Sequence, residues 1–400
     1  MINYQEAQRQ ILLFTKILKN ETISLDEAYG RVLAETVTAD RDYPPFNRAT
    51  MDGYAINCKD YDSGTREYNI ASTIYAGQEN TVTLLPGECY KIMTGAAVPL
   101  QADIIIKKED AGTTDKKIII KTNSCKAFQN IARQGEDIKA GSIIIDENKR
   151  CTPAVMSLLA ALGKHKVEVK QFPFISIFTT GNEIVPIEKT GVSTVQIRNS
   201  NQYLLKALLK EWNIIPQVCT HIPDDRAALK LAFTNALASD IVIINGGISA
   251  GDTDYVAETL IGIGVKMIFH KVAIRPGKPF WCGVMPNGGL AFALPGNPFS
   301  CMVTFNLFVK PYLTACFGLL PQPFLKLPLI DSRIKKTSLD DFFPVQVQPD
   351  PASLKALHFN TSGDIKATIF ADGIALHPSQ IDMLEKDVLV DYLSFGNSAF

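Results

Sequence analysis

Residues 241–254 read IVIINGGISAGDTD, an apolar run that meets a pair of glycines and then two aspartates. The run has the length of a buried strand, and a helical pattern follows it near 254–262. Similar runs at 175–179, 215–219 and 290–294 alternate with helical patterns near 201–212, 225–238 and 299–316. This alternation predicts a doubly wound, mainly parallel α/β domain.

Three loops that leave these strands have an unusual composition. They read TTGNE at 179–183, NGGISAGDTD at 245–254 and PGNP at 295–298. Ligands of open α/β sheets bind beyond the carboxyl ends of strands, and glycines let backbone N–H groups approach a phosphate. Each loop alone could be an ordinary tight turn, but the three together favour a phosphorylated substrate. The candidate substrate-binding residues in them are Gly181, Gly246, Gly247, Ser249, Gly251, Asp252, Pro295, Gly296 and Asn297.

The same loops carry carboxylates. Glu183, Asp252 and Asp254 would repel a phosphate unless a cation lay between them. Mg²⁺ binds through one or two carboxylates plus substrate oxygens in such sites. The sequence therefore predicts a divalent cation such as Mg²⁺ among these carboxylates, although either aspartate could instead cap the helix that begins nearby.

A cationic segment, KVAIRPGKP at 271–279, lies between the second and third loops. Strand alternation would place Lys271 and Arg275 on one face, and the Pro-Gly turn would direct Lys278 inward. Lysine and arginine together can hold a tetrahedral oxyanion. A surface strand that carries cations for solubility is the alternative interpretation.

The regions on either side of the predicted α/β domain have other sequence patterns. Residues 4–19 have helical spacing, Ser24-x-x-Glu27 resembles a capping box that opens a second helix to Leu33, and a helix is expected over 153–162. From the prolines at 44–45 to residue 137, short runs predict a β-rich domain with strands at 104–107 and 117–121. After the proline-rich linker at 321–328, runs at 367–370 and 388–392 predict a small C-terminal β-barrel or sandwich.

Composition limits the function classes. The chain is 46% hydrophobic and 20% charged with a formal net charge of -1, which offers no general attraction to nucleic acid or to an anionic membrane. No apolar run approaches the ~20 residues of a membrane span, and the N-terminus lacks a signal-peptide pattern, so a cytoplasmic location is expected. The eight cysteines form no CxxC pair, which favours buried free thiols over zinc ligation.

Seven motifs occur in an order that resembles the molybdopterin molybdenumtransferase family, which includes the catalytic domain of gephyrin. They are PPFNRATMDGYA at 44–55, MTGAAVP at 93–99, TTGNEI at 179–184, IRNSNQYLL at 197–205, NGGISAGDTDYV at 245–256, VAIRPGKPF at 272–280 and LPGNP at 294–298. The glycine-bearing α/β motifs alone would also fit pterin adenylyltransferases or competence-damage-type pyrophosphatases. The N-terminal motifs separate the chain from both groups.

The resemblance implies four domains: a discontinuous helical domain at 1–42 and 138–170, an inserted β-rich domain at 43–137, the α/β domain at 171–320 and a C-terminal β-barrel at 321–400. It also implies a homodimer whose active cleft joins the α/β domain of one subunit to the β-rich domain of the other. The implied reaction is Mg²⁺-dependent insertion of molybdate into adenylylated molybdopterin with release of AMP. Transient contact with a pterin adenylyltransferase and with molybdoenzymes is a further expectation.

The resemblance also assigns roles to residues. Asn182 stands where the family usually has Asp, and Arg275 where Lys is common. The segment 330–400 gives no match to the arginine and serine that the family contributes toward molybdate. Two alternatives remain open: a pterin adenylyltransferase-like enzyme, which ATP dependence would reveal, and a non-catalytic dimeric scaffold. The resemblance implies Mg²⁺ as the cofactor, with Glu183 and Asp254 as its ligands, and places Arg275, Lys278 and Ser300 in the molybdate-binding region. It implies catalytic roles for Asp52, Thr94, Asp137, Glu183, Asp254, Lys271 and Lys278.

Overall fold

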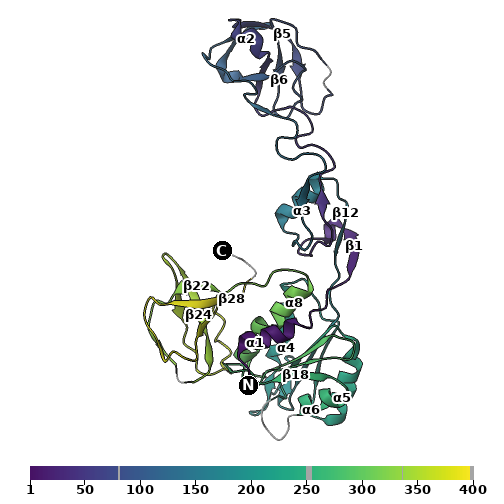
Figure 1. The fold of residues 1–400 in the computed structure, drawn as a ribbon, viewed down its shortest axis with the longest axis vertical. Helices are drawn as coiled ribbons and strands as arrows, with labels where there is room; N and C mark the ends of the chain where they lie inside the picture. Colours follow the sequence, from purple (N-terminus) through teal and green to yellow (C-terminus); the bar gives the residue numbers. More distant parts are fainter. Residues whose placement is uncertain (80–81, 249–254, 336, 397–400) are drawn as a thin grey trace. The chain divides into compact units, whose positions relative to one another are not determined.

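The computed structural model describes residues 1–79, 82–248, 255–335 and 337–396 of the chain. The chain divides into two compact units (Figure 1). Unit 1 contains Met1–Ala34, Asn148–Ser157 and the chain from His165 onward, and unit 2 contains Glu35–Glu147 and Leu158–Lys164. Strand pairs among the described residues join residues of the same unit, so each unit has its own sheets. The boundaries of the four predicted domains stay a prediction.

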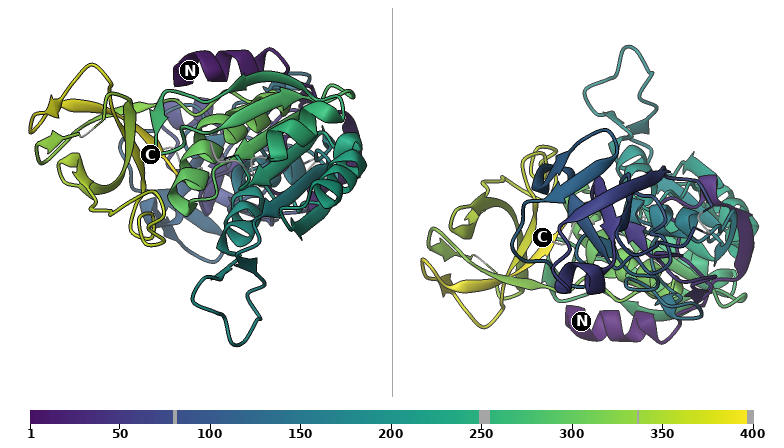
Figure 2. Two further views of the ribbon diagram at one scale, coloured as in Figure 1. Left: turned by 90° about the horizontal axis from the view of Figure 1, so that it is seen from below. Right: turned by 90° about the horizontal axis from the view of Figure 1, so that it is seen from above.

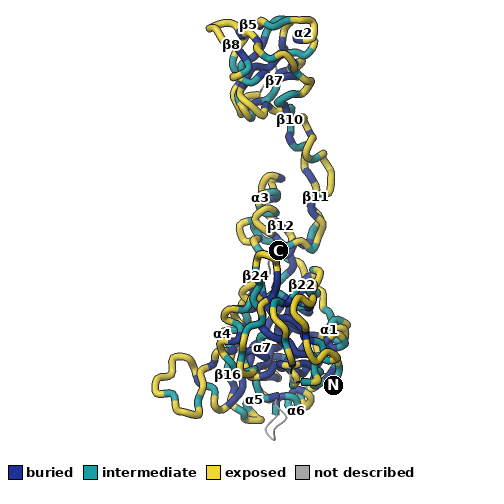
Figure 3. Tube along the Cα trace, turned by 90° about the vertical axis from the view of Figure 1, so that its left-hand side faces the viewer, coloured by how far each residue is buried: buried dark blue, intermediate teal, exposed yellow. Residues whose placement is uncertain are grey.

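The predicted α/β sheet is confirmed in unit 1. Every residue of its three central strands is buried, which explains their unbroken apolar character. Figure 3 shows the buried interior of this part of the chain in dark blue around α7. The first four of its six strands pair in parallel, and the last two join through antiparallel pairs. The strands run in the order β16 (Val218–Ile222), β13 (Ile175–Thr180), β17 (Ile241–Asn245), β21 (Leu290–Leu294), β20 (Trp281–Val284) and β18 (Lys266–His270).

Helices cover both faces of this sheet (Figure 2). One apolar cluster packs the sheet against α5 and α6, and the other packs it against α1, α4, α7 and α8. A short π-helical turn at Phe305–Val309 connects α7 to α8, so the single helix predicted over 299–316 is three elements. The helices are α1 (Tyr4–Leu12), α4 (Ser200–Lys210), α5 (Arg226–Asn235), α6 (Tyr255–Gly262), α7 (Pro298–Thr304) and α8 (Lys310–Cys316).

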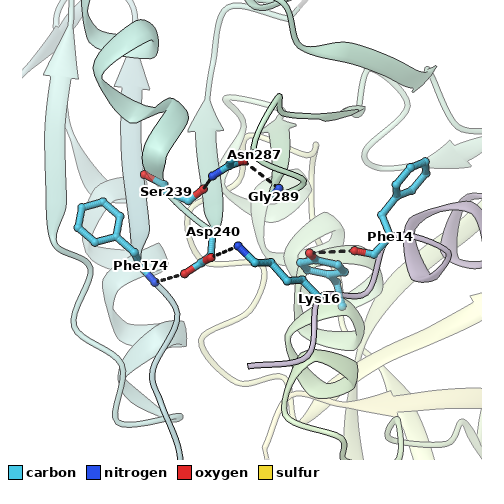
Figure 4. Close-up of polar contacts among 8 residues, drawn as sticks. Phe14, Lys16, Phe174, Ser239, Asp240, Asn287 and Gly289 are labelled. Carbon is cyan, nitrogen blue, oxygen red and sulfur yellow. Dashed lines mark hydrogen bonds and ion pairs between the residues drawn. The ribbon is translucent and has the colours of Figure 1, made fainter. Parts of the chain in front are cut away.

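The N-terminal segment is fastened to the amino ends of the sheet strands (Figure 4). Asp240, which precedes β17, accepts hydrogen bonds from Lys16 Nζ at 2.7 Å and from the backbone N–H of Phe174 at 2.9 Å. The Tyr312 hydroxyl donates to the carbonyl of Phe14 at 3.3 Å. These contacts lie at the edge of the sheet opposite to the three glycine-bearing loops, because Asp240 and Phe174 precede their strands.

Two N-terminal predictions are wrong. The helix predicted over 4–19 ends at Leu12, and no helix runs from Ser24 to Leu33. Instead, β1 (Asn20–Ser24) pairs antiparallel with β12 (Lys166–Lys170), and Leu25–Glu27 forms one 3₁₀ turn. Ser24 Oγ donates to the Glu27 carboxylate at 2.9 Å and caps no backbone N–H. Pairing with a strand far along the chain overrides the local capping signal.

A second six-stranded sheet follows in the C-terminal part of unit 1. The strand predicted over 367–370 is wrong: these residues form turns, and Ile369 and Phe370 are exposed rather than packed on a sheet. A bridge between Leu329 and Leu354 brings the end of β22 to β25, which favours the predicted barrel because it curls the sheet onto itself. The strands are β19 (Ile274–Arg275), β24 (Asp340–Pro349), β26 (Gly373–His377), β28 (Leu389–Ser394), β22 (Leu325–Pro328) and β25 (Ala352–Ala356), with the separate pair β23 (Arg333–Ile334) and β27 (Met383–Leu384).

Unit 2 contains the predicted β-rich region. The strands predicted at 104–107 and 117–121 are β7 and β9, and apolar clusters pack on both sides of their sheet. Its order is β7 (Ile104–Lys107), β4 (Gly53–Ile56), β6 (Glu88–Ile92), β5 (Glu67–Ile74), β9 (Lys117–Ile120) and β8 (Ala111–Thr113). The remaining elements of unit 2 are α2 (Cys58–Asp62), β2 (Val37–Thr38), β3 (Arg48–Ala49), β10 (Ile131–Ala132) and β11 (Ile143–Ile145). Helix α3 (Pro153–Ala161), which begins at the predicted Pro153, has residues in both units.

The cysteines are free thiols, as predicted. Five are buried, and Cys58, Cys125 and Cys219 are partly exposed. Within the described residues, no helix is both long and apolar enough to cross a membrane.

Candidate functional site

A cavity of about 900 Å³ opens at the carboxyl ends of β13, β17 and β21. The three strands are parallel neighbours, so their following loops meet at one edge, as the sequence predicts. Residues of all three loops line the cavity. The predicted residues among them are Gly181, Glu183, Gly246, Gly247, Pro295, Gly296 and Asn297.

The loop after β17 requires glycine at two successive positions. Gly246 has φ +99° and Gly247 has φ +64°, conformations that L side chains rarely adopt. A Cβ at Gly246 would lie 2.8 Å from the carbonyl oxygen of Thr180, and one at Gly247 would lie 2.5 Å from Val256 Cγ2. The bare backbone of this turn therefore forms part of the cavity wall, where its N–H groups can approach a ligand.

Two buried asparagines tie the loops together. Asn201 Nδ2, in α4, donates to Asn245 Oδ1 at 2.9 Å and to the carbonyl of Gly296 at 2.6 Å. Asn245 Nδ2, at the end of β17, donates to the carbonyl of Pro295 at 2.7 Å. These three bonds fix both amide orientations, because a flipped amide would face carbonyl oxygens with its own oxygen. This asparagine ladder, formed by Asn201 and Asn245, therefore holds the PGNP loop against β17 and α4.

Two carboxylates of the described residues line the cavity wall. Glu183 is exposed in the TTGNE loop, and Asp224 follows β16. Asn182 Oδ1 accepts a hydrogen bond from the Asp224 backbone N–H at 3.1 Å, which joins the two loops. Burial raises the pKa of Asp224 above its ordinary value, and the nearby charge of Glu183 adds to this effect. Neighbouring His221 bonds Thr179 Oγ1 through Nδ1 at 3.2 Å, and burial lowers the pKa of this imidazole.

Part of the predicted metal site cannot be placed. Ser249, Gly251, Asp252 and Asp254 lie outside the described residues. Among the residues that are described, no three His, Cys, Asp or Glu side chains gather closely enough to hold a metal ion by themselves. Glu183 is thus the one predicted metal ligand with a described position.

The cationic segment departs from the predicted strand. Lys271 has φ +67° and lies outside any strand, while Arg275 belongs to the two-residue strand β19. The prediction that both lie on one face of a continuous strand is therefore wrong, because the left-handed residue breaks the alternation. Lys278 is exposed rather than turned inward, and Pro279 is the residue of 271–279 that lines the cavity. Arg275 Nε lies 3.9 Å from Asp341 Oδ1.

Ser300 and the C-terminal part of unit 1 lie close to the PGNP loop. Ser300 is buried in α7, whose first turn follows Asn297. Asn297 Nδ2 donates to Ser362 Oγ at 2.8 Å, and the Phe299 backbone N–H donates to the Ser362 carbonyl at 3.1 Å. Gly363 lines the cavity as well. The C-terminal part of the chain thus completes one wall of the site.

Three predicted residues belong to unit 2. Asp52 Oδ1 accepts hydrogen bonds from both the backbone N–H and the hydroxyl of Thr94, each at 2.7 Å. These bonds hold the pKa of Asp52 below its ordinary value. Asp137 is exposed, and its backbone N–H donates to the Tyr43 carbonyl at 3.0 Å. Asp52 and Thr94 therefore form one exposed polar pair.

Sequence reasoning misses several cavity residues. Asp224 follows a parallel strand, so the rule that identified the other loops would also have found it with β16 placed at Val218–Ile222 instead of 215–219. The motif IRNSN contains Asn199 and Asn201 but gives no spacing signal for their contacts. Ser362 and Gly363 come from a turn-rich segment with no pattern that points to the site.

Comparisons with known proteins agree across both units. The chain matches family models described as the MoeA N-terminal region (domain I and II) over residues 2–163 and as a probable molybdopterin binding domain over residues 176–315. It is 31% identical to the molybdopterin molybdenumtransferase of Staphylococcus epidermidis, covering 100% of this chain and 97% of that protein. The enzyme of the same name from Synechococcus elongatus is 34% identical, with 82% and 83% covered. The crystal structure of the molybdopterin biosynthesis moeA protein from Pyrococcus horikoshii superposes with a TM-score of 0.85 at 26% identity, covering 98% and 100%.

Proposed function

The chain belongs to the molybdopterin molybdenumtransferase family, and we propose that its cavity binds adenylylated molybdopterin and that molybdate is inserted there with release of AMP. The observation that carries this proposal is the convergence of three glycine-bearing loops and two carboxylates on one cavity of about 900 Å³. Small-molecule sites usually measure roughly 300–1,000 Å³, so this cavity suits a ligand that combines a heterocycle, a pyrophosphate and a nucleotide.

The pyrophosphate is proposed to lie against the Gly246-Gly247 turn. The backbone of this turn can approach an oxyanion because neither glycine has a side chain. A side chain would not fit at either position, since a Cβ would meet neighbouring atoms within 3 Å. The N-terminus of α4, which contributes Ser200 and Asn201 to the cavity wall, adds partial positive charge. Hydrolysis of the phosphoanhydride by water would release AMP and leave the pterin with its own terminal phosphate. The two dithiolene thiols would bind molybdenum, and their protons would leave with one molybdate oxygen as water.

Mg²⁺ is the proposed cofactor. Glu183 and Asp224 offer the oxygen ligands that Mg²⁺ prefers, and this ion usually retains several waters, so one or two carboxylates suffice. When bound, Mg²⁺ would polarise the pyrophosphate oxygens of the substrate. AMP release should cease in excess chelator and return when Mg²⁺ is restored. Release that continues in the chelator would remove the cation from the proposal.

The molybdate oxyanion is proposed to bind near Pro279. Arg275 and Lys278 are exposed cations that precede this cavity residue in the chain, and Lys271 is a supporting charge. Ser300 lies in helix α7. Because Lys278 is exposed, Lys278→Ala should raise the half-saturating molybdate concentration about 2- to 5-fold, since an exposed charge pair contributes roughly 0.2–1 kcal/mol. Binding of the pterin nucleotide should change far less.

A homodimer is proposed in which unit 2 of the second copy completes each cleft. Asp52, Thr94 and Asp137 are exposed in unit 2, where a second chain could reach them. Asp52→Ala chains mixed with Glu183→Ala chains should recover activity, because one of the two clefts in the mixed dimer would be intact. No recovery in verified mixed dimers would place both residues in the cleft of one chain.

The direct test uses purified protein with adenylylated molybdopterin, molybdate and Mg²⁺, following AMP and reconstitution of an apo-molybdoenzyme. Both signals should depend on molybdate. Omission of molybdate is the matched control. ATP-dependent formation of adenylylated product from molybdopterin, without AMP release in the first mixture, would instead support an adenylyltransferase.

A further inference from the structure

Three polar residues form one row across the junction of the α/β domain and the C-terminal sheet. Arg275 of β19 is the register partner of Asp341 in β24, and Asp341 is in turn the partner of His377 in β26. Side chains of directly paired residues point to the same face of a sheet. The strand pairing therefore brings a carboxylate from the C-terminal sheet beside the guanidinium that we propose to bind molybdate.

Asp341 is held rigidly from one side. It is 1% exposed, and its Oδ2 accepts a hydrogen bond from Arg333 Nη2 at 2.6 Å. Arg333 Nη1 donates to His377 Nδ1 at 2.8 Å, because arginine has no acceptor. The Arg333 guanidinium also lies 4.0 Å above the Phe343 ring. Arg333 thus fixes one Asp341 oxygen and leaves the other toward β19.

The second oxygen of Asp341 faces Arg275. Asp341 Oδ1 is buried and has no hydrogen-bond partner among the described residues, and Arg275 Nε lies 3.9 Å from it. The neighbouring carboxylate of Asp340 is used elsewhere, since its Oδ1 accepts from the Ser379 backbone N–H at 2.7 Å. A buried carboxylate oxygen without a donor is costly, so this oxygen attracts the one cation that can reach it from β19.

We propose that Asp341 is a positioning residue that tethers the Arg275 guanidinium, so that the C-terminal sheet orients this cation for the molybdate oxyanion. The Arg275 side chain is 44% exposed, whereas that of Asp341 is 2% exposed, so the tether restrains the inner edge of the guanidinium and leaves its other donors toward solvent. Restraint before binding reduces the side-chain entropy that binding must otherwise remove. This inference rests on the proposed molybdate role of Arg275.

The first measurement examines the tether without any ligand. Phenylglyoxal modification of Arg275, followed by mass spectrometry of its peptide, should be several-fold faster in Asp341→Asn than in the native protein. Asp391→Asn is the matched control, because it removes an aspartate of the same sheet that pairs with Lys326 instead. An unchanged rate at Arg275 in Asp341→Asn would overturn the tether.

The second measurement is a double-mutant cycle on the molybdate dependence of AMP release. Asp341→Asn should raise the half-saturating molybdate about 2- to 5-fold, the upper part of the range expected for a partly exposed ion pair, with little change for the pterin nucleotide. In an Arg275→Ala background the same substitution should add almost nothing. If the effects of Asp341→Asn and Arg275→Ala on the half-saturating molybdate multiply, or if Asp341→Asn weakens the binding of molybdate and of the pterin nucleotide equally, the role of Asp341 is purely structural and the inference is overturned.

A variant that preserves charge balance guards against misfolding. Asp341→Asn combined with Arg333→Gln removes the buried cation that Asp341→Asn would otherwise leave unpaired. The double variant should fold and still show the raised molybdate requirement; a native requirement would overturn the tether. Arg275→Ala could leave the molybdate dependence native while Asp341→Asn still changes the modification rate of Arg275. That result would refute the proposed role of Arg275 in molybdate binding, and with it the proposed effect of Asp341 on that binding.

Discussion

Replacing Asn245 with leucine should destabilise unit 1 by about 2–4 kcal/mol. The substitution keeps the approximate size of the side chain but removes the donor to the Pro295 carbonyl at 2.7 Å and the acceptor for Asn201 Nδ2 at 2.9 Å. Asn201 retains its bond to the Gly296 carbonyl, so two groups lose a partner. Each buried polar group left unsatisfied costs roughly 1–3 kcal/mol, and both asparagines are buried.

Urea unfolding followed by tryptophan fluorescence measures this loss selectively. The chain has two tryptophans, Trp212 and Trp281, both buried in unit 1, so unfolding of unit 2 does not contribute directly to the signal. Asn235→Leu is the control, since Asn235 is exposed at the end of α5, and a surface change away from such contacts usually stays within about 0.5 kcal/mol. A loss below about 1 kcal/mol for Asn245→Leu would refute the reasoning that the ladder holds the loop.

Three further outcomes are expected. Gly247→Ala should weaken binding of adenylylated molybdopterin by ~10-fold or more in calorimetry, because alanine is strained at φ +64° and its Cβ would meet Val256 Cγ2 at 2.5 Å; native affinity would contradict a close backbone approach. Thr94→Val should raise the lowered pKa of Asp52 part of the way toward its ordinary value of 3.8 in an NMR titration, because the backbone N–H of residue 94, the larger cause of the shift, remains while the hydroxyl is lost. The hydroxyl contact stabilises the protein above that value, and the stabilisation is lost as the pH falls through the lowered pKa; an unchanged titration would assign the whole shift to the backbone bond. Cys301, whose pKa burial raises to about 12, should resist alkylation until the protein unfolds, and rapid labelling in the native state would show that α7 opens.

The sequence predicts the central sheet well because its signal is local. β17 and β21 have the predicted bounds, since each is an unbroken apolar run that ends at a turn residue. Their loops converge because neighbouring parallel strands end at one edge. Fold class and the main cavity follow from these two facts.

Prediction fails where a partner distant in the chain decides the structure. Ser24-x-x-Glu27 has the composition of a capping box, yet residues 20–24 pair with β12 as a strand. The strand near 215–219 begins three residues later because its register is set by pairing with β13. Because of this shift, the sequence does not identify Asp224 as a residue of the loop that follows the strand.

The residues of the site are of two kinds. Gly246 and Gly247 are constrained by their own backbone conformation, so the sequence identifies them directly. Asp341 and Ser362 matter through contacts with Arg275 and Asn297, which only the packing of the C-terminal part of unit 1 creates. A diverged C-terminal segment can therefore keep its contribution to the site, provided that the register between β19 and β24 is preserved, because the register and not a motif brings its side chains to the α/β domain.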